Sequence, residues 1–282
     1  MLDDTEEMKI NSESFKTTGH IKTNVRLLKD VQEYIDVIEY LRHDFNISLL
    51  WHRGVSHAKY ELIPRVYRDR LWQRHENYEW WIFTSFVNRA RSFIPDHSNY
   101  TQWNWYFTMQ HYGLPTRLLD WTEGSLIALY FAVRNPKNTY IPSVYVLDPY
   151  WFDEVVNDQK KGEGLVYSTD PAAISEEHNK LLSSYLESDS ECPCFPLCLQ
   201  PPATDLRITA QRSVFTIHGV YINAFRLVAR NNDEPHMAKI RFSTKYAEYI
   251  KDQLFAMGIT ESTLFPELEG LSRDLKWNFG IE

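Results

Sequence analysis

Cysteine is scarce in this chain and is confined to one short stretch. The 282 residues include three cysteines, all within seven positions: Cys192, Cys194 and Cys198. An odd number of such closely spaced cysteines is a poor disulfide framework and is typical of a reducing compartment. Their spacing is unusual for a zinc site, and Pro193 and Pro196 indicate a stiff loop. We therefore expect free thiols and no bound metal. The alternative is zinc with His178 or His218 as the fourth ligand.

Targeting and membrane-spanning segments are also lacking. Residues 1–22 are polar and acidic, without the basic flank and apolar stretch of a signal peptide. No apolar run approaches the roughly 20 residues that a membrane-spanning helix needs. With a net charge of −8, the surface as a whole does not favour binding to nucleic acid or to membranes. These features predict a cytoplasmic protein with no membrane partner and with a flexible N-terminal segment over residues 1–25.

The short motifs of common nucleotide-binding and hydrolytic enzymes are missing as well. The chain has no Walker-type phosphate loop, no GxGxxG loop, no GxSxG elbow and no HExxH zinc motif. The cysteines lie in a proline-containing loop, so a thiol nucleophile has little support. Any functional site must therefore be built from polar clusters in apolar surroundings.

Aromatic residues, by contrast, make up 15% of the chain. They supply area for a large core and for the walls of a ligand pocket. Hydrophobic periodicity predicts one α/β or α+β domain over residues 26–282, with an acidic insertion or lid around 160–205. Helices are expected at 30–46, 72–94, 103–111, 124–134 and twice within 246–277, and extended segments at 48–51, 60–67, 143–147, 207–218 and 238–242.

Positive charge is concentrated between Arg53 and Arg91, where eight Lys or Arg residues accompany four acids. An anionic ligand such as a pyrophosphate would explain this surplus in an acidic protein. A solvated basic helix face would explain it too, and charge counting alone favours that interpretation.

The first polar cluster is WHRG at residues 51–54, at the end of a predicted buried strand. A charge such as Arg53 is costly there unless it is paired or binds an anion. Its planar guanidinium suits a phosphate or carboxylate ligand, while an ion pair with an aspartate would only fix the strand end. Gly54 would let a ligand approach the backbone closely. Both interpretations of Arg53 are open at this point.

The densest polar cluster, QHYGLPTRLLDWT at residues 110–122, precedes a predicted apolar helix. So many hydrogen-bonding side chains in one loop exceed what folding requires. Asp120 would serve as a helix N-cap, as a partner of Arg117, or as a charge used in a reaction. In a third cluster, Gln211 and Ser213 share one face of a predicted strand and indicate a pocket wall.

Together these segments resemble the FRG domain family, named for an aromatic-Arg-Gly motif. The resemblance spans roughly residues 30–275 and is strongest at 110–122. Two departures occur: His52 precedes the arginine in place of an aromatic residue, and Arg212 follows Gln211 in place of a glycine. The other segments that carry the resemblance are 51–54, 62–68, 128–132, 207–215 and 258–271.

The resemblance implies an α+β fold with a mixed, mostly antiparallel central sheet flanked by helices, similar to the ADP-ribosyltransferase fold. It implies NAD as substrate and ADP-ribosyl transfer or NAD hydrolysis as the reaction, in a toxin or phage-defence effector that acts on a protein or nucleic-acid acceptor. The catalytic residues would be Asp120, Gln211 and His111. Gln211 is neutral where a catalytic glutamate is common, so Asp120 would supply the negative charge.

The same analogy assigns the residues that would bind NAD: Arg53, Gly54, Tyr112, Arg117, Trp121 and Thr122. Arg53 would bind the phosphates, and the Gly54 backbone would hold the carboxamide. Tyr112 or Trp121 would stack on nicotinamide, and Thr122 would hydrogen-bond the ribose. Two alternatives are a non-catalytic nucleotide sensor and an interaction module, and the latter should show Arg53 fully paired and no cavity.

Overall fold

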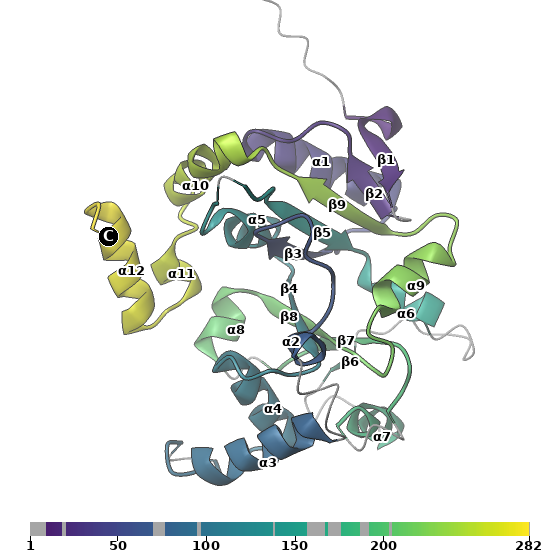
Figure 1. The fold of residues 1–282 in the computed structure, drawn as a ribbon, viewed down its shortest axis with the longest axis vertical. Coiled ribbons are helices and arrows are strands. Elements are labelled where there is room, and N and C mark those ends of the chain that lie inside the picture. The colour runs from purple at the N-terminus through teal and green to yellow at the C-terminus, as the bar shows by residue number, and fades with distance from the viewer. Residues whose placement is uncertain are drawn as a thin grey trace, which may run out of the picture.

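The central feature of the computed structural model is a nine-stranded sheet, ordered β1-β2-β9-β5-β3-β4-β8-β7-β6 (Figure 1). The structure describes residues 10–18, 21–69, 77–94, 97–137, 139–156, 167–168, 176–186, 192–202 and 205–281. The strands are β1 (Phe15–Thr18), β2 (Ile21–Asn24), β3 (Trp51–Val55), β4 (Leu118–Thr122), β5 (Ser143–Leu147), β6 (Tyr167–Ser168), β7 (Leu197–Gln200), β8 (Ser213–Ile217) and β9 (Met237–Arg241). Neighbouring strands are antiparallel except in the pairs β2/β9 and β6/β7. The predicted α+β fold with a mostly antiparallel sheet is confirmed.

Helices flank this sheet and enclose its apolar clusters. They are α1 (Val31–Asp44), α2 (Arg65–Arg68), α3 (Tyr78–Ala90), α4 (Gln102–His111), α5 (Ser125–Val133), α6 (Pro149–Val156), α7 (Glu176–Ser184), α8 (Leu206–Ala210), α9 (Ala224–Arg230), α10 (Ala247–Ala256), α11 (Glu261–Leu264) and α12 (Leu268–Asn278). Two 3-10 turns complete the chain, η1 (Ser12–Ser14) and η2 (Thr244–Tyr246). Helices α1, α5 and α10 share one buried cluster, and α3 and α4 contribute to a second. Across the described residues, no helix has the length and apolar character to cross a membrane.

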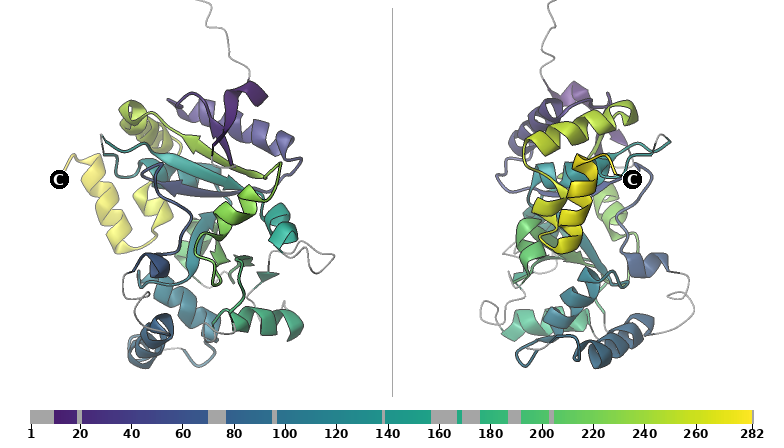
Figure 2. Two further views of the ribbon diagram at one scale, coloured as in Figure 1. Left: turned by 45° about the vertical axis from the view of Figure 1, so that its right-hand side comes forward. Right: turned by 90° about the vertical axis from the view of Figure 1, so that its left-hand side faces the viewer.

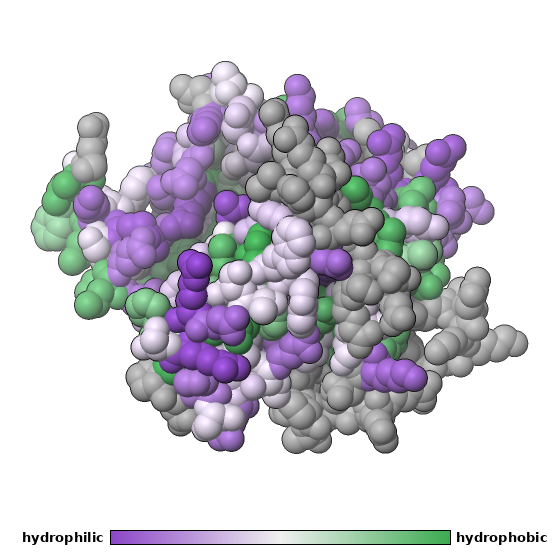
Figure 3. Space-filling model, turned by 60° about the horizontal axis from the view of Figure 1, so that its bottom comes forward, coloured by the Kyte–Doolittle hydropathy of each residue, from purple (hydrophilic) through white to green (hydrophobic). Residues whose placement is uncertain are grey.

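The C-terminal helices lie at one edge of the molecule (Figure 2). Helix α12 carries the exposed apolar residues Leu268, Leu271, Leu275 and Phe279. Hydrophobic surface is visible at the left edge of Figure 3, over this part of the chain. Helix α11 lies between α12 and the sheet-bound part of the fold, and it contacts α8. This contact brings the C-terminal segment next to the site described below.

The sheet is nearly divided between β3 and β4. Strand β3 pairs with β5 along five residues, but with β4 only at His52 and Thr122. Strand β4 in turn pairs with β8 along all five of its residues. Figure 1 shows the first group of strands crossing the upper part of the molecule, while β4 and β8 turn downward. Beyond the single pair the two strands diverge, and polar side chains replace the backbone ladder.

Helix α5 packs directly against β3 at Gly54. A Cβ atom at this position would lie 1.9 Å from the carbonyl oxygen of Ala128 and 2.7 Å from the backbone nitrogen of Ala132. Real Cβ atoms do not approach other atoms so closely, so the absent side chain is what lets the helix lie on the strand. The packing of α5 thus accounts for a glycine at this position; Gly54 also lines the cavity described below, and its contact with a ligand stays a prediction.

The N-terminal region joins the sheet, although residues 1–25 are predicted to be flexible. Strand β1 pairs with β2, and β2 pairs with β9. Asn24 fixes this edge, because its Nδ2 donates to the carbonyl oxygen of Arg241 at 2.9 Å. Arg241 NH2 donates in return to the carbonyl oxygen of Asn24 at 2.6 Å. Residues 15–18 and 21–24 are thus strands of the sheet, while residues 1–9 and 19–20 lie outside the described part.

Several local predictions are also corrected. Residues 65–68 form α2 within a segment predicted to be extended, and residues 118–122 form a strand within a predicted loop. The predicted strand at 207–218 divides into α8 and β8, so Gln211 ends a helix. The predicted insertion at 160–205 is described in part, and β6 and β7 within it belong to the sheet.

Two histidines are buried, and their burial predicts acid sensitivity. His52 and His218 are 3% and 0% exposed, and burial lowers the pKa of each from 6.5 to about 3. For His218, the charges of Arg53 and Arg117 add to this shift. Below pH 6.5 the unfolded chain gains protons that the folded protein does not bind, so stability is lost as the pH falls from 6.5 towards 3. We expect the free energy of unfolding to fall by about 2 kcal/mol per histidine between about pH 7 and pH 5.

Urea unfolding at the two pH values measures this loss. In His52→Gln, which cannot titrate, the pH dependence should be weaker than in the wild type by the contribution of one histidine. The comparison uses the pH dependence of each protein, so a uniform change in stability caused by the substitution does not affect it. An equal pH dependence in both proteins would contradict a buried, neutral His52.

Candidate functional site

A cavity of about 700 Å³ opens where β3 and β4 diverge. Residues of both strands, of the end of α5 and of α8 border it. Six polar residues from the three sequence clusters line this cavity: Arg53, Gln110, His111, Asp120, Thr122 and Gln211. The fold brings them together although up to 158 positions separate them (Gln211 minus Arg53). Their chemical roles stay predictions.

Positive charge dominates the walls of the cavity. Asp120 is the one carboxylate among the described residues that line it. The cations that line it are Arg53, Arg65, Arg68, Arg134, Lys137 and Arg207. Three of them, Arg53, Arg65 and Arg68, belong to the basic stretch between residues 53 and 91. This imbalance suits a ligand with several negative charges.

Arg68 lies in a position that is unfavourable for its charge. Burial, and then the nearby charges of Arg53 and Arg65, lower the pKa of Arg68. Arg65 donates from NH1 to the carbonyl oxygen of Gly113 at 2.6 Å. Arg68 makes no hydrogen bond or ion pair with any side chain in the described part of the chain. A bound anion would relieve the repulsion within this group of arginines.

Arg53 bridges the two strands where their backbone ladder is interrupted. Its NH1 donates to the backbone carbonyl oxygen of Asp120 and lies 3.4 Å from Asp120 Oδ2. Its Nε is buried without a hydrogen-bond partner among the described residues. Arg53 is thus only partly paired, so it fixes the end of the strand and still carries an unsatisfied donor.

The Asp120 carboxylate is held in place from two sides. Its Oδ1 accepts a hydrogen bond of 2.9 Å from Gln110 Nε2, and the Thr116 hydroxyl donates to the other end of the Gln110 amide. The Asp120 side chain remains 56% exposed. The N-cap of α5 is Gly124, so the interpretation of Asp120 as an N-cap is wrong. A fixed, exposed carboxylate among arginines is suited to act on a ligand.

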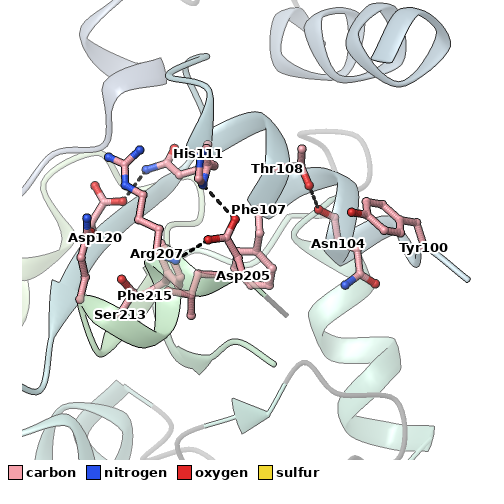
Figure 4. A pocket seen from close by; sticks show the side chains of 13 residues that line it. Tyr100, Asn104, Phe107, Thr108, His111, Asp120, Asp205, Arg207, Ser213 and Phe215 are labelled. Atoms are coloured by element: carbon pink, nitrogen blue, oxygen red, sulfur yellow. Dashed lines mark hydrogen bonds and ion pairs between the residues drawn. The ribbon is translucent and has the colours of Figure 1, made fainter. Parts of the chain in front are cut away.

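His111 contacts a carboxylate that the sequence did not single out. Its Nδ1 lies 3.1 Å from Asp205 Oδ2, and its Nε2 lies 3.7 Å from Glu267 Oε1. Figure 4 shows the first contact, and it also shows the bond from the Arg207 backbone N–H to Asp205, 2.6 Å long. His111, Asp205 and Arg207 line a smaller chamber of about 120 Å³. Nothing local in the sequence pairs His111 with residues about 90 and 150 positions away.

The C-terminal segment supports the site from outside the cavity, because Glu261 and Phe265 contact cations that line it. Glu261 Oε2 accepts hydrogen bonds of 2.8 Å from Arg134 NH2 and 2.9 Å from Arg273 Nε. The guanidinium groups of Arg134 and Arg207 lie 4.5 Å and 4.6 Å from the centre of the Phe265 ring. Two cations of the cavity are therefore positioned by residues that only the tertiary fold brings to them.

Two of the predicted NAD-binding residues do not line the cavity. Arg117 is 4% exposed, and its Nε donates to Glu79 Oε2 at 2.6 Å, so its ion pair is with Glu79 and not with Asp120. Tyr112 is 71% exposed and lies outside the cavity lining. Trp121 does line the cavity, although its ring is buried and donates from its indole N–H to Thr216 Oγ1 at 3.1 Å. Its stacking on nicotinamide stays a prediction.

Thr122 and Gln211 line the cavity, yet parts of both are engaged in the fold. The Thr122 hydroxyl donates to the Gln211 carbonyl oxygen at 2.7 Å and accepts from Gly124 N at 2.9 Å. Its proton is therefore not available to a ribose oxygen while this bond persists. Gln211 Nε2 donates to the Leu264 carbonyl oxygen at 3.0 Å. Through these two bonds, Thr122 and Gln211 join β4 to the C-terminal segment.

The three cysteines are free thiols, two of them buried. Cys192 Sγ accepts a hydrogen bond of 2.9 Å from Arg117 NH1. Among the described residues, no group of three or more His, Cys, Asp or Glu side chains could hold a metal ion. The side chain of His178, which the zinc alternative names, lies outside the described part.

Comparison with known proteins gives one assignment. Residues 48–140 match the model of the FRG domain family. The matched range runs from β3 to just beyond α5 and includes Arg53, Arg68, His111 and Asp120. No curated protein and no solved structure matches the chain. Most of the residues that line the cavity fall within the matched range, while Arg207, Gln211 and Ser213 lie beyond it.

Proposed function

We propose that the cavity binds NAD and that the chain cleaves the bond between nicotinamide and ribose, by ADP-ribosyl transfer or hydrolysis. The observation that carries this proposal is the arrangement of charge. A group of partly unpaired arginines borders the cavity, and one oriented carboxylate, that of Asp120, lies among them. NAD has the complementary arrangement, with two negative charges on its pyrophosphate and one positive charge on its nicotinamide ring. The volume of about 700 Å³ is in the range of small-molecule sites.

In this proposal the arginines hold the pyrophosphate and Asp120 faces the reacting ribose. Arg68 and Arg53 supply donors that the protein leaves unsatisfied. During the reaction the bond between ribose C1′ and the nicotinamide nitrogen breaks, and nicotinamide leaves with the bonding electron pair. The ribose then carries positive charge, which a carboxylate stabilises better than a neutral amide does. The nearly divided sheet is compatible with an ADP-ribosyltransferase-like fold, which is part of the proposal.

A non-catalytic nucleotide sensor is the second candidate, and Gln211 favours it. This residue is neutral, and its amide nitrogen is engaged with the carbonyl oxygen of Leu264. A sensor would bind NAD through the same arginines without releasing nicotinamide. An interaction module is less well supported, because it should have no cavity and a fully paired Arg53.

Arg68→Ala is expected to weaken NAD binding at least tenfold while leaving the fold intact. A hydrogen bond to a charged group contributes about 1.5–3 kcal/mol. The fold should tolerate the substitution, because among the described residues no side chain loses a partner when Arg68 is removed. Titration calorimetry with NAD measures the affinity, and nicotinamide release measures the reaction.

Arg226→Ala is the matched control, since Arg226 is exposed on α9 and does not line the cavity. It should bind NAD as the wild type does. Equal affinity of Arg68→Ala and the control would count against a phosphate site at this position. Binding without nicotinamide release by the wild type would support the sensor.

A further inference from the structure

The smaller chamber adjoins the main cavity at Asp120. The two spaces share the lining residues Gln110, His111, Asp120, Arg207, Gln211 and Ser213. The chamber alone is lined by Tyr100, Asn104, Phe107, Thr108 and Asp205, among others. Its volume of about 120 Å³ is too small for a nucleotide but has room for several water molecules beside polar groups. It is therefore placed to hold a water molecule beside Asp120, the carboxylate that faces the ribose of NAD in the proposed reaction.

Asp205 determines which nitrogen of His111 carries a proton. A carboxylate only accepts hydrogen bonds, so the 3.1 Å contact with Nδ1 is favourable when Nδ1 bears the hydrogen. In a neutral ring the lone pair then resides on Nε2. Glu267 Oε1, at 3.7 Å from Nε2, lies beyond hydrogen-bond distance. Nε2 is thus left able to accept a proton.

Asp205 is itself held in position and kept ionised. It is the N-cap of α8, and its Oδ1 accepts from the Arg207 N–H at 2.6 Å. The hydrogen bond with His111, and then those with backbone N–H groups, hold the pKa of Asp205 below its ordinary value, against the effect of burial. One carboxylate oxygen therefore serves the helix and the other serves the histidine (Figure 4).

We propose that His111, positioned by Asp205, acts as the general base that deprotonates a water molecule held in the smaller chamber. This inference rests on the proposed cleavage of NAD. The water oxygen forms a bond to ribose C1′ as the bond to nicotinamide breaks, and the water proton passes to His111 Nε2. The products are ADP-ribose, nicotinamide and one proton. The structure thus assigns hydrolysis, with His111 as a catalytic residue and Asp205 as a positioning residue.

Asp205→Asn tests the positioning role without removing the helix cap, because asparagine caps helices about as well as aspartate. Its amide N–H groups would face Nδ1, which favours the ring hydrogen on Nε2 and removes the lone pair that accepts the proton. We expect nicotinamide release to slow about 10²-fold with unchanged NAD affinity. His111→Gln should slow it at least as much.

The control is Asp30→Asn, since Asp30 is likewise an N-cap whose carboxylate accepts from a backbone N–H, at 2.8 Å, but it lies on α1, away from the site. This variant should release nicotinamide at the wild-type rate.

The pH profile gives a second measurement. The wild-type rate should depend on pH through a group that His111→Gln lacks, so the pH profiles of the two proteins should differ in shape. The charged groups around the ring are Asp205, Glu267, Arg207 and Asp120.

The outcomes separate the two proposals. If the wild type binds NAD but releases no nicotinamide, the proposed reaction fails and the general base fails with it. If the wild type releases nicotinamide and Asp205→Asn matches it in rate and pH profile, only the role of the His111–Asp205 pair is overturned. If labelled ADP-ribose is recovered attached to protein and not free in solution, water is not the nucleophile, and the assignment of hydrolysis is overturned.

Discussion

Glu79→Gln is expected to lower the free energy of unfolding by about 3–5 kcal/mol, because it breaks a buried ion pair. The side chains of Glu79 and Arg117 are each 5% exposed, and Arg117 Nε lies 2.6 Å from Glu79 Oε2. The other oxygen, Oε1, accepts from the Arg117 backbone N–H at 2.7 Å and from the Tyr106 hydroxyl. One carboxylate thus joins α3, α4 and the start of β4. Glutamine keeps the shape but removes the charge that faces the buried guanidinium.

Urea unfolding of Glu79→Gln and of Glu269→Gln measures this effect. Glu269 forms an exposed ion pair with Arg273 on α12, at 2.6 Å, and its side chain is 79% exposed. Exposed pairs contribute at most about 1 kcal/mol, so the control variant should be almost as stable as the wild type. A loss of the same size in both variants would show that burial of the Glu79 pair adds nothing.

The same ion pair illustrates why part of the site could not be predicted. Arg117 lies three positions from Asp120 in the densest polar cluster, and sequence proximity indicated a pair between them. Its actual partner, Glu79, is 38 positions earlier (117 minus 79), on a helix whose position depends on tertiary packing. In β4, moreover, successive side chains point to opposite faces, so Trp121 is buried while Asp120 is exposed.

What the sequence did predict rests on local features with a direct physical cost. Arg53 after a buried segment, and the polar run that includes Gln110 and Asp120, are expensive for folding alone, and both line the cavity. Strand β4 was not predicted, because Asp120, exposed within a strand of five residues, resembles a helix N-cap in the sequence. The segment is extended because it pairs with β8, and that contact has no local signal. The roles of Asp205, Glu261 and Phe265 carry no local signal, since each depends on a contact across the fold.

Asp120→Asn is expected to fold normally and to lose about 10²–10³ in the rate of nicotinamide release. The side chain is 56% exposed, and asparagine can still accept the hydrogen bond from Gln110, so the structure should tolerate the change. What is lost is the negative charge that stabilises the developing positive charge on the ribose. The reaction should therefore suffer far more than stability.

Binding distinguishes this role from a merely structural one. Asp120 is the one carboxylate among the described residues that line a cavity rich in arginine, so removing its charge should leave the affinity for an anionic dinucleotide equal or higher. If Asp120 only helped to position Arg53, to which it offers its backbone oxygen and a 3.4 Å side-chain contact, the asparagine variant should keep most of its turnover. Glu123→Gln is the control, because Glu123 is close in sequence, pairs with Arg212 at 3.3 Å and does not line the cavity. Calorimetry, thermal melts and nicotinamide release on both variants test the prediction. Full turnover in Asp120→Asn would exclude the carboxylate from the reaction and leave NAD binding without cleavage as the better-supported function.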